Sequence, residues 1–191
     1  MHKLLFVIDV QNDFITGSLG TKEAENALPK IIEKVQNWDG AIVSTKDEHD
    51  ENYLNTFEGK RLPIKHCILN TTGYDMPKAL ESEIRKKTNI IYPKEYFSDY
   101  HVMDFVKKYR VQMYENGLRA SLLRPKFSEI HLIGLCTDIC VISNAILAKA
   151  YFPDIPIIVD ASCCAGSTPE NHKAALQIMK CCQIDVINEE E

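Results

Sequence analysis

Three reactive side chains stand directly after apolar runs of the sequence. Asp9 closes the run at residues 4–8, Cys140 comes shortly after the run at residues 130–134, and Lys94 follows a third. At the start of a predicted helix, the backbone dipole would lower the pKa of the Cys140 thiol and favour the thiolate. Burial would raise the pKa of Asp9 towards that of a general base, and Lys94 would lower the thiol pKa further. Together they predict nucleophilic catalysis, although each alone could be a packed thiol, a turn carboxylate or a solvated lysine.

A second group of side chains has the chemistry of metal ligands. Asp47 and His49 lie two residues apart after another apolar run, so their side chains can point the same way, and Glu58 and His66 follow. Two imidazoles and two carboxylates suit one divalent ion, with zinc preferred and manganese or iron as alternatives. A polar loop without metal is the competing interpretation. The irregular stretch at residues 46–75 favours the metal, because loops of that length are usually functional or disordered.

The reactive residues need a sheet whose strand ends meet at one edge. Six short runs rich in Ile, Val and Leu do not alternate with polar residues, as is typical of strands buried on both faces. Helical spacing fills the gaps between them, with a proline and capping residues starting the last helix. This predicts an α/β fold with three layers: a mostly parallel six-stranded sheet with helices on both faces. The expected strands are residues 3–8, 41–45, 89–92, 130–134, 156–160 and 184–187, and the expected helices are 25–37, 118–123, 138–150 and one from 167 through 179.

Length and composition narrow the class of protein. The 191 residues suit one domain over 1–191, and a net charge of −5 without a basic run argues against nucleic acid and membrane as partners. The apolar run at residues 4–8 is too short for a signal peptide or a membrane span. Seven cysteines without an export signal indicate a reducing compartment, so we expect a cytoplasmic protein. The adjacent pairs 163–164 and 181–182 do not have zinc-ribbon spacing, and we expect them to pack as small apolar residues.

Taken together, these segments resemble the isochorismatase-like cysteine hydrolases and, within them, the nicotinamidase/pyrazinamidase branch. The resemblance extends over nearly the whole chain, and the run from Gly134 to Val141 is its most specific part. Residues 100–116 are the least similar and look like an extra segment, whose structure and role the sequence does not give. The segments that carry the resemblance are residues 7–14, 45–49, 62–67, 94–98, 134–141 and 160–172.

The resemblance implies a role for each matching residue. Asp9, Lys94 and Cys140 would form a catalytic triad. The peptide bond before Cys136 would be cis, and the backbone N–H groups of Cys136 and Cys140 would form the oxyanion hole. The thiol of Cys136 would then be incidental to the reaction.

The resemblance also implies a metal site and a substrate site. Asp47, His49 and His66 match the metal-binding positions of nicotinamidases, and Glu58 stands where some members have a further ligand. The aromatic residues Phe14, Tyr96 and Phe97 would hold the substrate ring. Pro63 departs from the tryptophan that many nicotinamidases carry there, and dimers or larger homo-oligomers occur in the family.

From these features we predict a metal-dependent cysteine amidohydrolase that acts on a linear amide. The substrate would be nicotinamide, converted through a Cys140 thioester to nicotinic acid and ammonia. One alternative keeps the chemistry and changes the substrate to another small amide or ureide. Two others are a thiol redox protein that uses Cys136 and Cys140, and an inactive binding module on the same fold.

Overall fold

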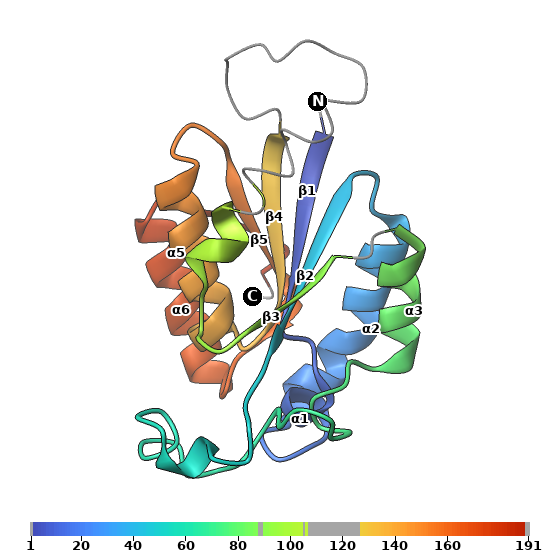
Figure 1. The fold of residues 1–191 in the computed structure, drawn as a ribbon. Coiled ribbons are helices and arrows are strands. Elements are labelled where there is room, and N and C mark those ends of the chain that lie inside the picture. The colour runs from blue at the N-terminus through green and yellow to red at the C-terminus, as the bar shows by residue number, and fades with distance from the viewer. Residues whose placement is uncertain (1, 88–89, 105, 107–126, 190–191) are drawn as a thin grey trace.

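A computed structural model describes residues 2–87, 90–104, 106 and 127–189 of the chain. Six parallel strands form one sheet in the order β3-β2-β1-β4-β5-β6 (Figure 1), so the first strand lies inside the sheet. The three-layer, six-stranded α/β fold expected from the sequence is therefore confirmed. The strands are β1 (His2–Ile8), β2 (Ala41–Asp47), β3 (Ile91–Lys94), β4 (Phe127–Leu135), β5 (Ile157–Ala165) and β6 (Asp185–Ile187).

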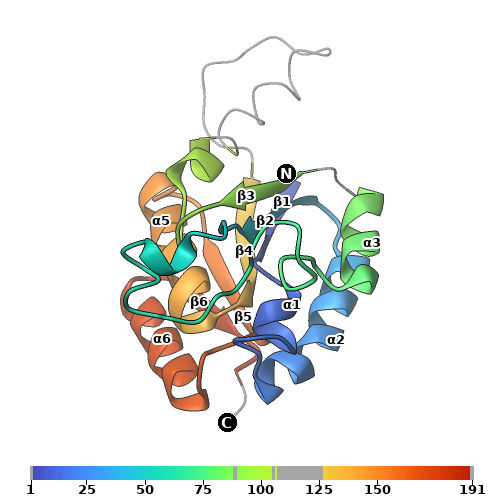
Figure 2. The same cartoon turned by 60° about the horizontal axis from the view of Figure 1, so that its bottom comes forward.

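Helices cover both faces of the sheet. Figure 1 shows α1, α2 and α3 on one side of the strands, and α5 and α6 on the other. A loop that carries the short helix η1 lies over the carboxyl ends of the strands (Figures 1 and 2). The helical elements are α1 (Asn12–Ile15), α2 (Lys22–Asn37), η1 (Tyr53–Asn55), α3 (Lys78–Lys87), η2 (Thr137–Val141), α5 (Ile142–Tyr151) and α6 (Pro169–Cys181).

Strand β1 shows why the sequence folds into three layers. Its side chains alternate between the two faces, so Phe6 and Ile8 join the core beneath α5 and α6, whereas Leu5 and Val7 join the core beneath α2 and α3. All four are fully buried. An apolar run without alternation therefore supplies both cores at once, and it ends at Asp9, where the sheet reaches its carboxyl edge.

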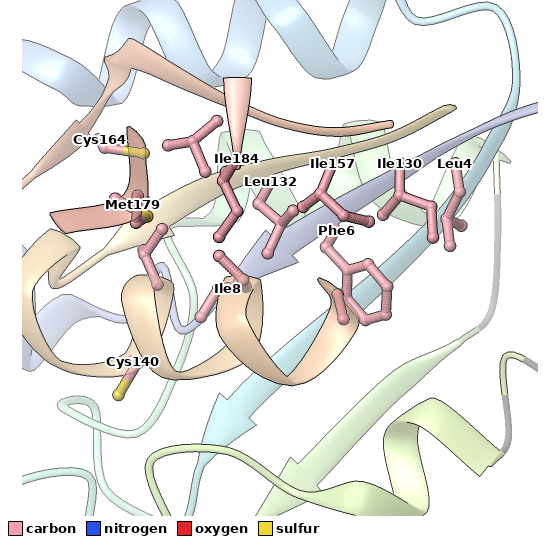
Figure 3. Packing of buried hydrophobic residues seen from close by; sticks show 14 of the residues in the cluster. Leu4, Phe6, Ile8, Ile130, Leu132, Cys140, Ile157, Cys164, Met179 and Ile184 are labelled. Atoms are coloured by element: carbon pink, nitrogen blue, oxygen red, sulfur yellow. The ribbon is translucent and has the colours of Figure 1, made fainter. Parts of the chain in front are cut away.

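Cys140 lies at the border of the first of these cores. Its sulfur points away from the aliphatic side chains of Ile8 and Leu132 in Figure 3, towards the edge of the cluster. The residue is 4% exposed. The fold thus holds the cysteine firmly while turning its thiol out of the hydrocarbon core.

Several helix and strand boundaries in the structure differ from those expected from the sequence. Helix α2 starts at Lys22 because the Thr21 side chain accepts a hydrogen bond from the N–H of Ala24, which caps it. Strand β3 ends at Lys94, which thus belongs to the strand. Helix α3 was not predicted, and the helix expected at residues 118–123 lies outside the described residues.

The cysteine pairs also differ from expectation. Cys163 and Cys164 do not follow the fifth strand but lie within β5, where they are buried as apolar packing residues. Cys181 and Cys182 are exposed at the end of α6, so the expectation that this pair packs inside was wrong. The reason is their position on the last turn of an amphipathic helix, beyond its buried face. Among the described residues, no helix is long and apolar enough to cross a membrane.

Candidate active site

The three reactive residues meet at the carboxyl edge of the sheet. The Lys94 Nζ atom lies 2.6 Å from Asp9 Oδ2 and 3.7 Å from the Sγ atom of Cys140. Asp9 is fully buried, and Lys94 and Cys140 are 2% and 4% exposed. Such a buried lysine needs a compensating carboxylate, which Asp9 supplies. The structure therefore brings together residues from three separate strand ends into one ion-paired group around a thiol.

Asp9 reaches this position through a turn in the backbone. Its φ of 46° is in the left-handed region, which is uncommon for a residue other than glycine. Next to it, Gly134 pairs with Ile8 at a φ of 132°, and a Cβ there would lie 2.0 Å from the Ile8 carbonyl oxygen. The Thr45 hydroxyl donates a 2.7 Å hydrogen bond to Asp9 Oδ1. The hydrogen bond from Thr45 in β2 and the close packing of Gly134 against Ile8 thus fix the position of the Asp9 carboxylate.

Cys140 lies in a π-helical turn that precedes α5. The N–H of Val141 donates to the carbonyl of Cys136 at 3.0 Å, which closes the wider turn, and the regular helix begins only at Ile142. Cys140 therefore lies near the start of a helical segment, as expected, but the regular α-helix starts at Ile142 and not at the expected residue 138. The peptide bond between Leu135 and Cys136 is cis, as the family resemblance implies.

Two side-chain contacts hold this turn in place, one with helix α6 and one with the segment just before that helix. Asp138 accepts hydrogen bonds from the N–H of Ser167 at 2.7 Å and from its hydroxyl at 2.5 Å. The Thr137 hydroxyl lies 2.8 Å from His172 Nδ1. The turn that carries the thiol is therefore clamped to a segment about thirty residues further along the chain.

Burial has the largest influence on the pKa values of Cys140 and Asp9. It raises the pKa of the Cys140 thiol well above its ordinary value, although the positive charge of Lys94 acts in the opposite direction. The lowered thiol pKa expected from the sequence was wrong, because enclosure disfavours the thiolate more than Lys94 favours it. Burial also raises the pKa of Asp9, as expected, despite the ion pair with Lys94. A carboxylate with a raised pKa beside a protonated thiol is suited to accept its proton.

The predicted metal ligands converge beside this group. Asp47 Oδ2 lies 3.0 Å from His49 Nε2 and 3.4 Å from His66 Nε2, and all three side chains are at least nine-tenths buried. The candidate ligand atoms of these three residues lie within 4.8 Å of one another. Glu58 Oε1 is 3.9 Å from both imidazole Nε2 atoms. We refer to Asp47, His49 and His66 as the Asp-His-His group.

This donor set fits a divalent metal ion. Ligands about 2 Å from a shared zinc ion are separated by roughly 3.3 Å, which is close to the spacing found here. His66 Nδ1 lies 2.8 Å from the carbonyl oxygen of Ile64, and such a bond orients the other ring nitrogen towards a metal. Burial works to raise the pKa of Asp47, but the hydrogen bonds with His49 and His66 outweigh it and hold that pKa below its ordinary value. A carboxylate that stays ionised completes a site for a cation.

Both groups open into one cavity of about 1150 Å³. Cys140 and the Asp-His-His group line it, whereas Asp9 and Lys94 lie beneath, out of reach of solvent. The predicted substrate aromatics line it as well. Phe14 is buried, with its ring centre 5.6 Å from that of His66, whereas Tyr96 and Phe97 are 67% and 45% exposed. The cavity therefore has a polar floor and an aromatic entrance.

Sequence reasoning gave no role to several side chains that build the site. The Gln11 amide exchanges two hydrogen bonds with the backbone of Asp47, at 2.8 Å and 2.7 Å. Tyr53 is fully buried, and its ring centre lies 4.6 Å from that of His49 and 4.9 Å from that of His66. Asn144 donates to backbone carbonyls near the cavity. A polar residue inside a helix gave no signal that could single it out.

The fold and the buried Cys-Asp-Lys arrangement define an α/β enzyme with its site at the carboxyl edge of a parallel sheet. The family model of the isochorismatase domain matches residues 3–191, so the chain belongs to the isochorismatase family. The resemblance noted in the sequence is thereby confirmed.

Relatives and solved structures agree with this assignment. The chain is 26% identical to the nicotinamidase of Schizosaccharomyces pombe, over 100% of this chain and 94% of that protein. The crystal structure of nicotinamidase PncA from Bacillus subtilis matches with a TM-score of 0.77 at 26% identity, covering 97% of this chain and 99% of that one. The pyrazinamidase of Pyrococcus horikoshii, solved in complex with zinc, shares the fold with a TM-score of 0.73 at 24% identity, over 99% and 100% of the two chains. The chain is therefore similar over nearly its whole length to proteins named as nicotinamidases and pyrazinamidases.

Proposed function

We propose that this enzyme hydrolyses nicotinamide to nicotinic acid and ammonia through a thioester on Cys140. The observation that carries the proposal is the placement of Lys94 Nζ, 2.6 Å from Asp9 Oδ2 and 3.7 Å from Cys140 Sγ, next to the Asp-His-His group in one cavity. The nicotinamidases among its relatives support this choice of substrate. The match over residues 3–191 supports a single hydrolase domain over 1–191.

In the first half of the reaction, Asp9 takes the proton of Cys140 as the sulfur attacks the amide carbon. The N–H groups of Cys136 and Cys140 stabilise the oxyanion. Asp9 then returns the proton to the leaving nitrogen, so that ammonia departs and the thioester remains. The raised pKa of Asp9 supports this role, because the carboxyl can hold the proton between the two steps.

In the second half, water attacks the thioester and releases the acid. Asp9 accepts a proton from that water and returns it to the departing sulfur, so that Cys140 leaves as the thiol and Asp9 is ionised again. Lys94 keeps its charge throughout: burial works to lower its pKa, but the negative charges of its neighbours, Asp9 first among them, together outweigh burial and raise that pKa above its ordinary value. Its ammonium holds the carboxylate in place and offsets the negative charge that develops on sulfur.

Asp47, His49 and His66 would hold one divalent ion, which we propose to be zinc, with Glu58 as a further ligand. Bound there, the ion would act as a Lewis acid that takes a ring nitrogen or acidifies water. Phe14, which packs beside His66, would place the substrate ring against this group. The aromatic side chains of Tyr96 and Phe97 would enclose it from the entrance.

A second candidate is another small amide or ureide, bulkier than nicotinamide, acted on by the same residues. The cavity of about 1150 Å³ favours it, because one pyridine ring fills a small part of that volume. Pro63, which departs from the family pattern, also lies in the loop above the cavity. A panel of nicotinamide, pyrazinamide and carbamoyl compounds, assayed by ammonia release, separates the two. Nicotinamide should give the highest kcat/KM, and a preference for a carbamoyl compound would refute the proposed substrate.

The nucleophile is tested by a matched pair of cysteine variants. Cys140→Ala should abolish ammonia release, whereas Cys136→Ala should keep it, because the proposed role of Cys136 uses its backbone alone. Circular dichroism and zinc content serve as controls for folding and for the metal site. Near-normal activity of Cys140→Ala would refute the mechanism. A wild-type protein that releases no ammonia but forms a reversible disulfide between Cys136 and Cys140 would favour the redox alternative. All seven cysteines are free, which supports a reducing compartment and the proposed cytoplasmic location.

A further inference from the structure

Asn144 lies in α5, one turn after Cys140, and its side chain has no exposed surface. Its Nδ2 atom donates two hydrogen bonds, one to the carbonyl of Cys140 at 2.8 Å and one to the carbonyl of Phe97 at 2.9 Å. An amide group has two N–H donors, so this side chain uses both. One buried residue therefore connects the turn that carries the thiol with the segment that carries the entrance aromatics.

The segment at residues 95–98, which Asn144 connects to the turn around Cys140, lacks regular structure. It follows the end of β3 at Lys94, and its two aromatic side chains, Tyr96 and Phe97, are largely exposed. Burial of side chains therefore does little to fix it. Two donors hold its backbone instead: Lys94 Nζ bonds the Tyr96 carbonyl at 2.9 Å, and Asn144 bonds the next carbonyl. Both donors also contact Cys140.

The acceptor half of the same amide points to a role beyond packing. The Oδ1 atom of Asn144 is buried and has no hydrogen-bond partner among the described residues. An unsatisfied buried oxygen destabilises the folded state, and a leucine of similar size would fill the space without that cost. The contribution of the asparagine must therefore come from its two donors.

We propose that Asn144 is a positioning residue that sets the distance between the entrance aromatics and the thiol of Cys140. The inference rests on the proposed function, because it assumes that Tyr96 and Phe97 bound the substrate ring. Loss of the bond to Phe97 releases the segment at residues 95–98. The substrate then binds less well, while the attack by a correctly held thiol is little changed.

Two substitutions separate the two bonds of Asn144. Asn144→Leu removes both. Asn144→Thr keeps the bond to Cys140, because a threonine hydroxyl in a helix can donate to the carbonyl four residues earlier, but it is too short to reach Phe97. Asn188→Gly is the control, since it removes a 3.0 Å asparagine bond to Asp160 away from the cavity, and glycine suits the left-handed φ of 55° at this position.

Both Asn144 variants should raise KM for nicotinamide about fivefold, the effect of one lost hydrogen bond, with kcat changed less than about twofold. Amide hydrogen exchange of a peptide covering residues 95–98 should be faster in both, and melting temperatures of Asn144→Leu should not fall. The control should leave both KM and that exchange at their wild-type values.

Other results would overturn the inference. An Asn144→Thr variant with wild-type KM and exchange would assign the effect to the bond with Cys140. A fall in kcat at constant KM in both variants would place the role in the attack itself, and unchanged KM and exchange would leave a packing role only. Hydrogen exchange requires no substrate. If the wild-type enzyme fails to hydrolyse nicotinamide but exchange at 95–98 still rises in both variants, the proposed function fails and the connection made by Asn144 stands.

Discussion

The triad and the Asp-His-His group occupy the same edge of the sheet but differ in how their charges are balanced. Lys94 and Asp9 neutralise one another inside the protein, 2.6 Å apart and out of contact with solvent. The Asp-His-His group holds an ionised carboxylate with two imidazoles, and Glu58 adds a second acid nearby. Lys94 Nζ also lies 3.9 Å from Asp47 Oδ1, but its single charge is already matched by Asp9, so the second group keeps an excess of negative charge that a bound cation would balance.

The two groups are also held differently. Asp9 directly follows strand β1, and Lys94 is the last residue of strand β3. Cys140 lies in a turn that hydrogen bonds hold against the sheet, so the sheet fixes all three triad residues. His66 and Glu58 come from the loop above the sheet, and Tyr53 and the Ile64 carbonyl are what orient His66 there. We therefore expect damage to the triad to affect both stability and chemistry, and damage to the metal group to affect metal binding and the substrate binding that depends on it, with little effect on stability.

The largest effect is expected from breaking the buried ion pair. Lys94→Met leaves the carboxylate of Asp9 buried without a charged partner, which should lower the free energy of unfolding by about 3–5 kcal/mol and abolish turnover. Urea unfolding and ammonia release at neutral pH measure both effects.

The double variant Asp9→Asn with Lys94→Met is the control for this experiment. It removes both charges, so most of the stability should return while turnover stays absent. If Lys94→Met is as stable as the wild-type protein, the two charges do not depend on one another as described.

An intermediate effect is expected from the metal group. His66→Ala should lower zinc affinity by about a hundredfold, and Glu58→Gln by about tenfold, since Glu58 lies further from the imidazoles. Competition with a chromophoric chelator measures both affinities. Both variants should keep the wild-type rate of Cys140 alkylation by iodoacetamide. Undiminished zinc binding by His66→Ala would remove this residue from the site.

The smallest effect is expected from pH. Because burial raises the pKa of Cys140, the thiol keeps its proton at neutral pH and loses it only as the pH rises beyond the ordinary thiol range. The rate of alkylation at Cys140, followed by mass spectrometry, should therefore rise steadily to above pH 9. A plateau below pH 7 would indicate a preformed thiolate and contradict this assignment.

The sequence was most informative where a local pattern determines the structure. Apolar runs located the strands, and the residues after them, such as Asp9 and Asp47, came together because parallel strands end at one edge. The helical start near Cys140 was predicted, but its π-helical form was not, because the turn is held by long-range contacts with Ser167 and His172 that no local pattern reveals. The thiol pKa was mispredicted because the extent of burial depends on the whole fold. Asn144 was missed for the same reason.

The central claim is that Cys140 carries the acyl group during turnover. Acid quenching of the enzyme with nicotinamide in the first turnovers, followed by peptide mass spectrometry, tests this most directly. We predict a nicotinoyl group on the peptide that contains Cys140, present in Cys136→Ala and absent in Cys140→Ala. An unmodified Cys140 while ammonia is released, or the acyl group on another residue, would contradict the account.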